Sequence, residues 1–149
     1  MKIEYHNIYI HYILITRHRF PFIKESSRIR IEKYITGIVA NTGSKLYSIY
    51  ANPDHIHFLI SRNPAISDQE LITRIANGSL KFILENNLCN SNFEWQESTA
   101  AFSVSKSEVD KVCKYIINQP EHHKKMSFQQ EYNELMKFYQ QTIKWELQK

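Results

Sequence analysis

Glycine, cysteine and long apolar runs are scarce in this chain of 149 residues, and each shortage excludes a class of protein. With three glycines there is no G-x-G-x-x-G fingerprint, and residues 37–45, which come nearest to a phosphate-binding loop, have the wrong spacing and order. Two cysteines are too few for a disulfide framework or a zinc knuckle, which favours a reducing compartment. No segment approaches the roughly 18 apolar residues of a membrane span. We therefore expect no chemistry driven by nucleotide hydrolysis, and a cytoplasmic protein with no membrane segment.

The residues that are present suffice for one ordinary hydrophobic core, because 42% are hydrophobic and 23% are charged. There is no internal repeat and no linker rich in proline, glycine or serine, so residues 1–149 are predicted to form a single domain. The formal net charge of +4 is compatible with a polyanionic partner but does not identify one.

Residue patterns predict strands that alternate with helices along the chain. Runs rich in aromatic and β-branched residues predict strands at 5–16, 45–51, 55–61 and, as one or two further strands, at 93–96 and 100–104. Apolar residues at helical spacing predict helices from Ser26 or Ser27 to near Gly43, from Ser67 to Glu85, from Ser105 to Pro120, and over 127–147. Two of these helices begin with the spacing of a capping box, at Ser67–Glu70 and at Ser105–Glu108.

The order strand, helix, strand, strand, helix, strand is that of the ferredoxin-like split βαβ arrangement. The predicted fold class is therefore α+β: a ferredoxin-like (RRM-like) antiparallel sheet with helices on one face, followed by C-terminal helices over about 107–147.

The first candidate site is His55-Ile56-His57 in a predicted strand. Side chains alternate along a strand, so the two histidines share one face and could hold a single metal ion between them. Two imidazoles are an incomplete ligand set, and a third ligand must come from elsewhere. Taken alone, such a pair is more often two structural histidines than a metal site.

The second candidate is Tyr115 with Gln119, four residues apart on a predicted helix and therefore one turn apart on the same face. That face is predicted to lie away from the apolar stripe of Val109, Val112, Cys113 and Ile116. On helix grounds alone, a tyrosine there is usually a half-buried packing residue. A phenol with an ordinary pKa of about 10 attacks poorly unless a cation or a base assists it.

Several basic side chains could follow a nucleic-acid backbone, although most such residues are simply solvated. The candidates are Arg17, Arg19, Arg28, Arg30, Lys81, and the pair His122 and His123 in a predicted loop after Pro120. The remaining histidines, His6, His11 and His18, have no evident metal-like partner in the sequence.

Three ordered blocks resemble the single-tyrosine HUH transposases of the 200/605 group of insertion sequences and the related REP-associated tyrosine transposases. Asp54–Leu59 is similar to their D-H-(hydrophobic)-H-L-L core. Trp95–Glu97 followed by Ala101–Ser105 is similar to W-Q-x and A-F-S-V-S, and Tyr115–His123 to Y-I-x-N-Q-x-E-H-H. The chain departs from the family at residues 77–80, where Asn77 replaces the lysine of a K-G-S-S element.

The resemblance implies a ferredoxin-like DNA transposase that cuts and rejoins single-stranded DNA at hairpins. It implies that His55, His57 and Gln119 bind a divalent metal, Mg²⁺ or Mn²⁺, and that Tyr115 is the nucleophile, giving a 5′-phosphotyrosine intermediate. A homodimer with shared active sites is also expected. The alternative is a non-catalytic, transposase-derived module that binds nucleic-acid hairpins by shape and stacking.

Overall fold

The computed structural model describes the backbone of residues 1–147 and the side chains of residues 1–137. The chain forms two compact units, Met1–Ile117 and Asn118–Lys149. No helix among residues 1–147 is both long and apolar enough to cross a lipid bilayer.

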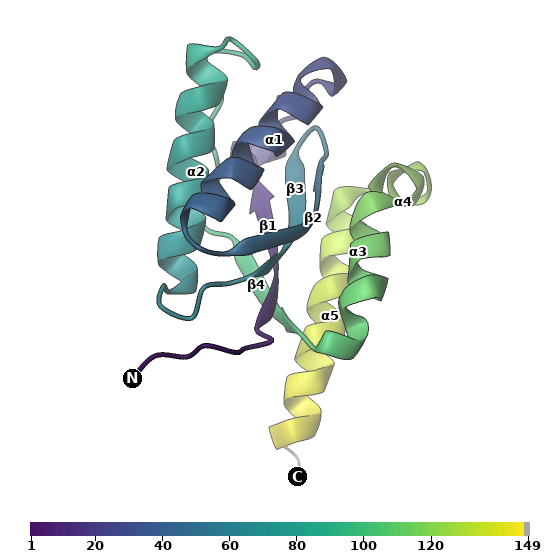
Figure 1. Cartoon of the computed structure of the whole chain (residues 1–149). Helices are drawn as coiled ribbons and strands as arrows, with labels where there is room; N and C mark the ends of the chain where they lie inside the picture. The colour runs from purple at the N-terminus through teal and green to yellow at the C-terminus, as the bar shows by residue number, and fades with distance from the viewer. Residues whose placement is uncertain (148–149) are drawn as a thin grey trace. The chain divides into compact units, whose positions relative to one another are not determined.

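The first unit is built on a four-stranded antiparallel sheet (Figure 1). Its strands are β1 (Tyr9–Ile15), β2 (Lys45–Ala51), β3 (His55–Ser61) and β4 (Ala100–Val104). Their spatial order is β2-β3-β1-β4, which is the ferredoxin-like order and confirms the predicted fold class. Residues 93–96 are not a strand, because they contribute only an isolated bridge between Thr16 and Trp95.

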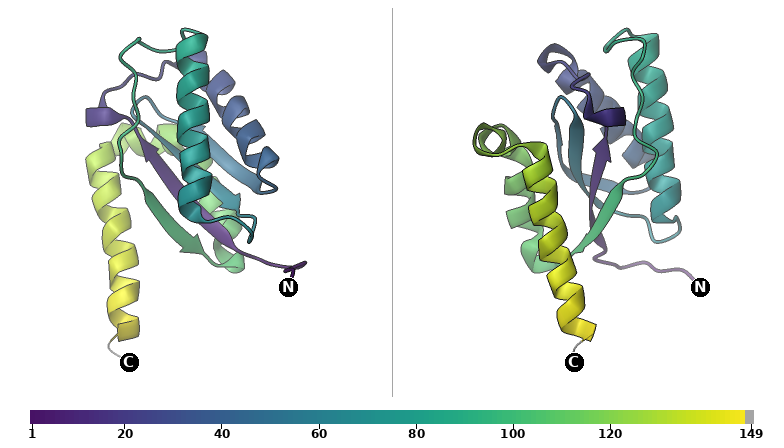
Figure 2. Two further views of the ribbon diagram at one scale, coloured as in Figure 1. Left: turned by 90° about the vertical axis from the view of Figure 1, so that its left-hand side faces the viewer. Right: turned by 180° about the vertical axis from the view of Figure 1, so that it is seen from behind.

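One face of the sheet is covered by the two long helices α1 (Glu25–Asn41) and α2 (Asp68–Glu85), which lie side by side (Figures 1 and 2). The side chains beneath them alternate along each strand, with Ile56 and Phe58 of β3 fully buried in this core. Tyr34 of α1 stacks on Phe82 of α2 with ring centroids 4.0 Å apart. The strand order places β1 and β3, which contribute to this apolar layer, at the centre of the sheet.

The observed hydrogen bonds at the helix starts confirm one predicted start and correct two others. Ser67 Oγ accepts a hydrogen bond from the backbone N–H of Glu70 at 3.0 Å, which confirms the predicted cap of α2. Helix α1 begins at Glu25 rather than at Ser26 or Ser27, because Ser27 is buried and its hydroxyl donates to Leu88 O at 3.0 Å. Ser105 is not a side-chain cap: its hydroxyl pairs with that of Ser107, and a 3₁₀ turn follows it.

Helix α3 (Val109–Ile117) packs on the opposite face of the sheet, against β2 and β3. The predicted continuation to Pro120 is wrong, because α3 ends at Ile117 and a new helix, α4 (Gln119–Lys125), begins after Asn118. Proline lacks the N–H that an uninterrupted helix would need there, but it fits the first turn of a new helix. The second unit then consists of α4 and α5 (Phe128–Leu147), so His122 and His123 lie in a helix and not in a loop.

Candidate active site

Two histidines of β3 form the centre of the site, on the face opposite Ile56 and Phe58. His55 and His57 are both fully buried, and their ring centroids are 5.0 Å apart. A ring nitrogen of one lies within 4.8 Å of a ring nitrogen of the other. Strand alternation thus places two imidazoles close enough to share one ligand, as the sequence pattern predicts.

The turn before β3 sets the orientation of His55. Its Nδ1 lies 2.7 Å from Asp54 Oδ1, and its Nε2 lies 3.1 Å from Asn52 Nδ2. A carboxylate can only accept and an amide NH₂ can only donate, so the imidazole carries its proton on Nδ1 and its lone pair on Nε2. A carboxylate on the distal nitrogen is the usual support for a metal-binding histidine. From the sequence, Asn52 has no predicted role in the site, and Asp54 enters only as the first residue of the D-H-(hydrophobic)-H-L-L motif.

The orientation of His57 is set from the neighbouring strand by His11. Nε2 of His11 lies 2.9 Å from Nδ1 of His57, and the two rings are tilted by 36°. His11 is opposite Leu59 in the β1–β3 register and is therefore a diagonal neighbour of His57, within reach of a long side chain. His11 was predicted to have no metal-like partner. The signal that could have found its contact with His57 is strand alternation combined with the ferredoxin-like strand order.

Tyr115 lies in the last turn of α3 and packs against the histidines of its own chain. Its ring centroid is 5.7 Å from that of His57 and 6.4 Å from that of His11. The prediction that Tyr115 faces away from the apolar stripe is wrong, because it packs in the same small cluster as Val112 and Leu59. That packing is what brings the phenol to the histidine face.

Gln119 belongs to the second unit, where it joins α4 to α5. Its Nε2 donates to Oε2 of Glu131 at 3.0 Å, and His123 Nε2 lies 2.9 Å from its Oε1. The prediction that Tyr115 and Gln119 share one helix face is wrong, because the break at Asn118 places them in different helices. Glu131, which holds the amide in place, had no signal in the sequence.

The predicted DNA-contacting cations of the first unit have partners within the chain. Arg28 hydrogen-bonds to Glu25 and to Glu32, and its guanidinium lies 4.6 Å from the ring centroid of Tyr50. Burial raises the pKa of Glu32, and the charge of Arg28 opposes that rise. The other pairs join Arg17 to Glu94, Arg30 to Asn86, and Lys81 to Glu85. The DNA-binding role of these side chains stays a prediction.

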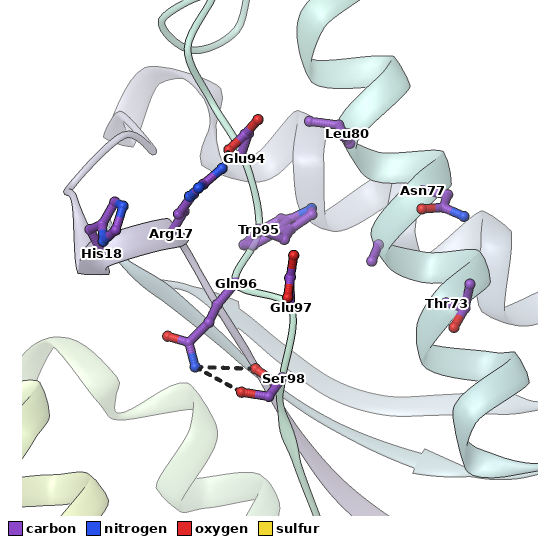
Figure 3. A pocket seen from close by; sticks show the side chains of 11 residues that line it. Arg17, His18, Thr73, Asn77, Leu80, Glu94, Trp95, Gln96, Glu97 and Ser98 are labelled. Atoms are coloured by element: carbon purple, nitrogen blue, oxygen red, sulfur yellow. Dashed lines mark hydrogen bonds and ion pairs between the residues drawn. The ribbon is translucent and has the colours of Figure 1, made fainter.

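An open pocket lies between α2 and the loop that follows it (Figure 3). The W-Q-x block forms one wall: Trp95 Nε1 donates to Ser79 Oγ at 3.0 Å, and Gln96 Nε2 donates to Ser98. Arg17 and His18 line it from the segment after β1, where His18 has a positive φ of 57°. Its lining contains neither the histidines of β3 nor Tyr115.

Known proteins are similar to this chain in sequence and in fold. A family model described as "Transposase IS200 like" matches residues 4–119. A crystal structure of a protein from Deinococcus radiodurans assigned as a transposase aligns with a TM-score of 0.61 at 17% identity, over 80% of this chain and 96% of that one. The structure of a REP-associated tyrosine transposase bound to a REP hairpin aligns with a TM-score of 0.59 at 14% identity, over 82% and 74%. No protein with a curated description matches the sequence.

Proposed function

Because the chain belongs to the IS200-like transposase family, we propose that it cuts and rejoins single-stranded DNA with Tyr115 as the nucleophile. The observation that carries this proposal is the placement of a phenol against a pair of oriented imidazoles, with the Tyr115 and His57 rings 5.7 Å apart. Pure binding of nucleic acid would not require these groups to converge on one buried spot.

In the proposed reaction, the Tyr115 oxygen attacks the scissile phosphorus. The phenol loses its proton as its oxygen bonds to phosphorus, the bond from phosphorus to the 3′ oxygen breaks, and the leaving 3′ oxygen takes up one proton to become a hydroxyl, so the proton count is unchanged. The product is a 5′-phosphotyrosine link, which a second 3′-hydroxyl reverses. One phosphodiester replaces another at each step, so no nucleotide hydrolysis is needed, in line with the absence of a phosphate-binding loop.

The donor set suits a divalent metal. The lone pair of His55 lies at Nε2 because Nδ1 is bonded to Asp54; in this structure it accepts from Asn52 Nδ2, so a bound metal would replace that hydrogen bond. Oε1 of Gln119 is the amide oxygen that the family resemblance adds as third ligand. When bound, Mg²⁺ or Mn²⁺ would act as a Lewis acid that stabilises the charge developing on the scissile phosphate. The chain's own part is to hold two neutral imidazoles in fixed orientation and to keep the phenol beside them.

For the substrate, we propose single-stranded DNA ends that fold into hairpins. Support comes from the family and from the structural neighbour described as bound to a REP hairpin. Labelled hairpin DNA incubated with the protein and Mn²⁺ tests this directly, by formation of a covalent adduct that survives denaturation. Hairpin binding without any adduct, across several flanking sequences from the gene's own locus, would instead identify a non-catalytic binding module.

Strand exchange requires two cuts to be brought together, and we propose that two copies of the chain pair to do so. Sharing of residues between the two sites, which the resemblance implies, is not needed to bring Tyr115 to His57. Helix α3 packs on β2 and β3 of its own chain and places the two rings together. We therefore propose a dimer in which Tyr115 acts with His57 of its own chain, in place of the shared sites that the resemblance implies.

A further inference from the structure

Each histidine of β3 is contacted at its Nδ1 by a different residue. Nδ1 of His55 lies 2.7 Å from Asp54 Oδ1, and Nδ1 of His57 lies 2.9 Å from His11 Nε2. We propose that His11 is a positioning residue: it accepts a hydrogen bond from His57 Nδ1 and so directs the lone pair of His57 Nε2 toward the metal. This inference rests on the metal-dependent function proposed above.

The proton count between the two rings decides the direction of the hydrogen bond. A neutral imidazole has one N–H and one lone pair, so the contact carries one proton, donated either by His57 Nδ1 or by His11 Nε2. If His11 donated, the proton of His57 would be on Nε2, and that nitrogen could not bind a metal. Metal binding at His57 Nε2 therefore requires His11 to accept, with its own proton on Nδ1.

The position of His11 suits a fixed support. It lies on β1, which is paired to β3 on one side and to β4 on the other, so its backbone is held by two ladders. Its side chain is 1% exposed, and its ring contacts Phe102 with centroids 6.4 Å apart. A buried polar group is costly unless it is hydrogen-bonded, and the bond to His57 gives this histidine a reason to occupy a central strand.

A pair of substitutions at position 11 separates this role from packing. His11→Gln keeps an acceptor oxygen at a reach similar to that of Nε2, whereas His11→Leu fills the space without one. Titration with Mn²⁺ alone, followed by calorimetry, should show affinity about 10-fold or more weaker for His11→Leu. The His11→Gln variant should stay within about threefold of wild type. Hairpin binding measured without metal should be unchanged in both variants.

Equal Mn²⁺ affinity in wild type and His11→Leu would overturn the inference and leave the proposed function intact. A wild-type chain that binds no Mn²⁺ would remove the metal step itself, and with it the role of His11. The two failures are therefore distinguishable.

A measurement on the wild-type chain covers the case in which His11→Leu does not fold. Two-bond ¹H–¹⁵N correlation spectra of the imidazole rings report which nitrogen carries the proton. His57 is expected to be protonated on Nδ1 and His11 to have its lone pair on Nε2. A spectrum with the His57 proton on Nε2 would overturn the proposal.

Discussion

The two faces of the sheet are built from the same strands, but one forms the apolar core and the other carries the histidine site. On β3, Ile56 and Phe58 face α1 and α2, while His55 and His57 face the other way, and all four are fully buried. The apolar side chains need nothing beyond close packing. Each histidine needs hydrogen-bond partners, and the structure supplies them from Asp54, from the Asn52 amide and from a second strand.

The apolar face makes the buried polar site possible. The apolar face supplies most of the stability through burial of large side chains, and so gives the central strands fixed positions. The histidine face uses those fixed positions to hold ring nitrogens in one orientation. Substitutions on the first face should therefore change the free energy of unfolding, and substitutions on the second should change chemistry.

The largest expected effect is on chemistry. Tyr115→Phe removes the nucleophilic oxygen and little of the packed surface, so the covalent adduct should fall at least about 1,000-fold, below detection. Hairpin binding should stay within about threefold of wild type. Denaturing gels with labelled DNA measure the adduct, and Tyr47→Phe, at an exposed tyrosine, is the matched control. An adduct that persists in Tyr115→Phe would assign the nucleophile to another residue.

On the apolar face, Phe58→Ala should lower the free energy of unfolding by about 3–5 kcal/mol, because it leaves a cavity beneath α1 and α2. Urea denaturation followed by circular dichroism measures the change. The conservative variant Phe58→Leu should cost clearly less. A loss below about 1 kcal/mol for Phe58→Ala would show that this face does not dominate stability.

The contrasting change one residue away is His57→Ala. It should reduce metal-dependent adduct formation about 100-fold, because the site loses one of its ligands. The same change should lower the free energy of unfolding by only about 1–3 kcal/mol, since His57 is buried and bonded to His11. Metal titrations of the adduct yield measure the first effect. Unchanged yield at matched Mn²⁺ would remove His57 from the metal site.

A smaller effect is expected from Tyr12, whose hydroxyl donates to Asp68 Oδ1 at 2.6 Å. Burial, reinforced by Asp68, raises the pKa of Tyr12, so the folded chain keeps this phenol neutral where the unfolded chain ionises it. The contribution of the neutral Tyr12 phenol to the free energy of unfolding is complete below about pH 10 and is lost as the pH rises further. Tyr12→Phe should lower the free energy of unfolding by about 1 kcal/mol at neutral pH. The variant should also lose less of that free energy than wild type as the pH rises above 10. Urea denaturation at neutral pH and above pH 10 measures both, and a wild-type–variant difference that stays constant with pH would contradict the assignment.

For a mixture of two inactive variants, we expect no recovery of adduct formation. A mixture of His57→Ala and Tyr115→Phe chains should remain inactive after subunit exchange, because Tyr115 contacts His57 of its own chain. If sites were shared between chains, a mixed dimer would contain one intact site and adduct formation would return. Adduct assays on a heterodimer isolated with two affinity tags decide between the two arrangements.

Features that depend on neighbouring residues could be predicted from the residue pattern alone. Alternation along 55–61 determined that the two histidines share a face, and the spacing of Ser67 and Glu70 determined one helix start. The order of the elements was enough to predict the ferredoxin-like sheet. The helix break at Asn118 was not predicted, although Pro120, in the first turn of the next helix, was a signal for it because proline is disfavoured inside a helix.

Contacts between side chains that are distant in the sequence could not be predicted from the residue pattern, because they depend on the fold. His11 and His57 are 46 residues apart, and their contact follows from the pairing of β1 with β3 in a register that makes them diagonal neighbours. Tyr115 reaches the histidines because α3 packs on the sheet, although its own helix pattern indicated the opposite face. Strand pairing and helix packing are set by the sum of many distant contacts, whereas periodicity and capping depend on a few adjacent residues.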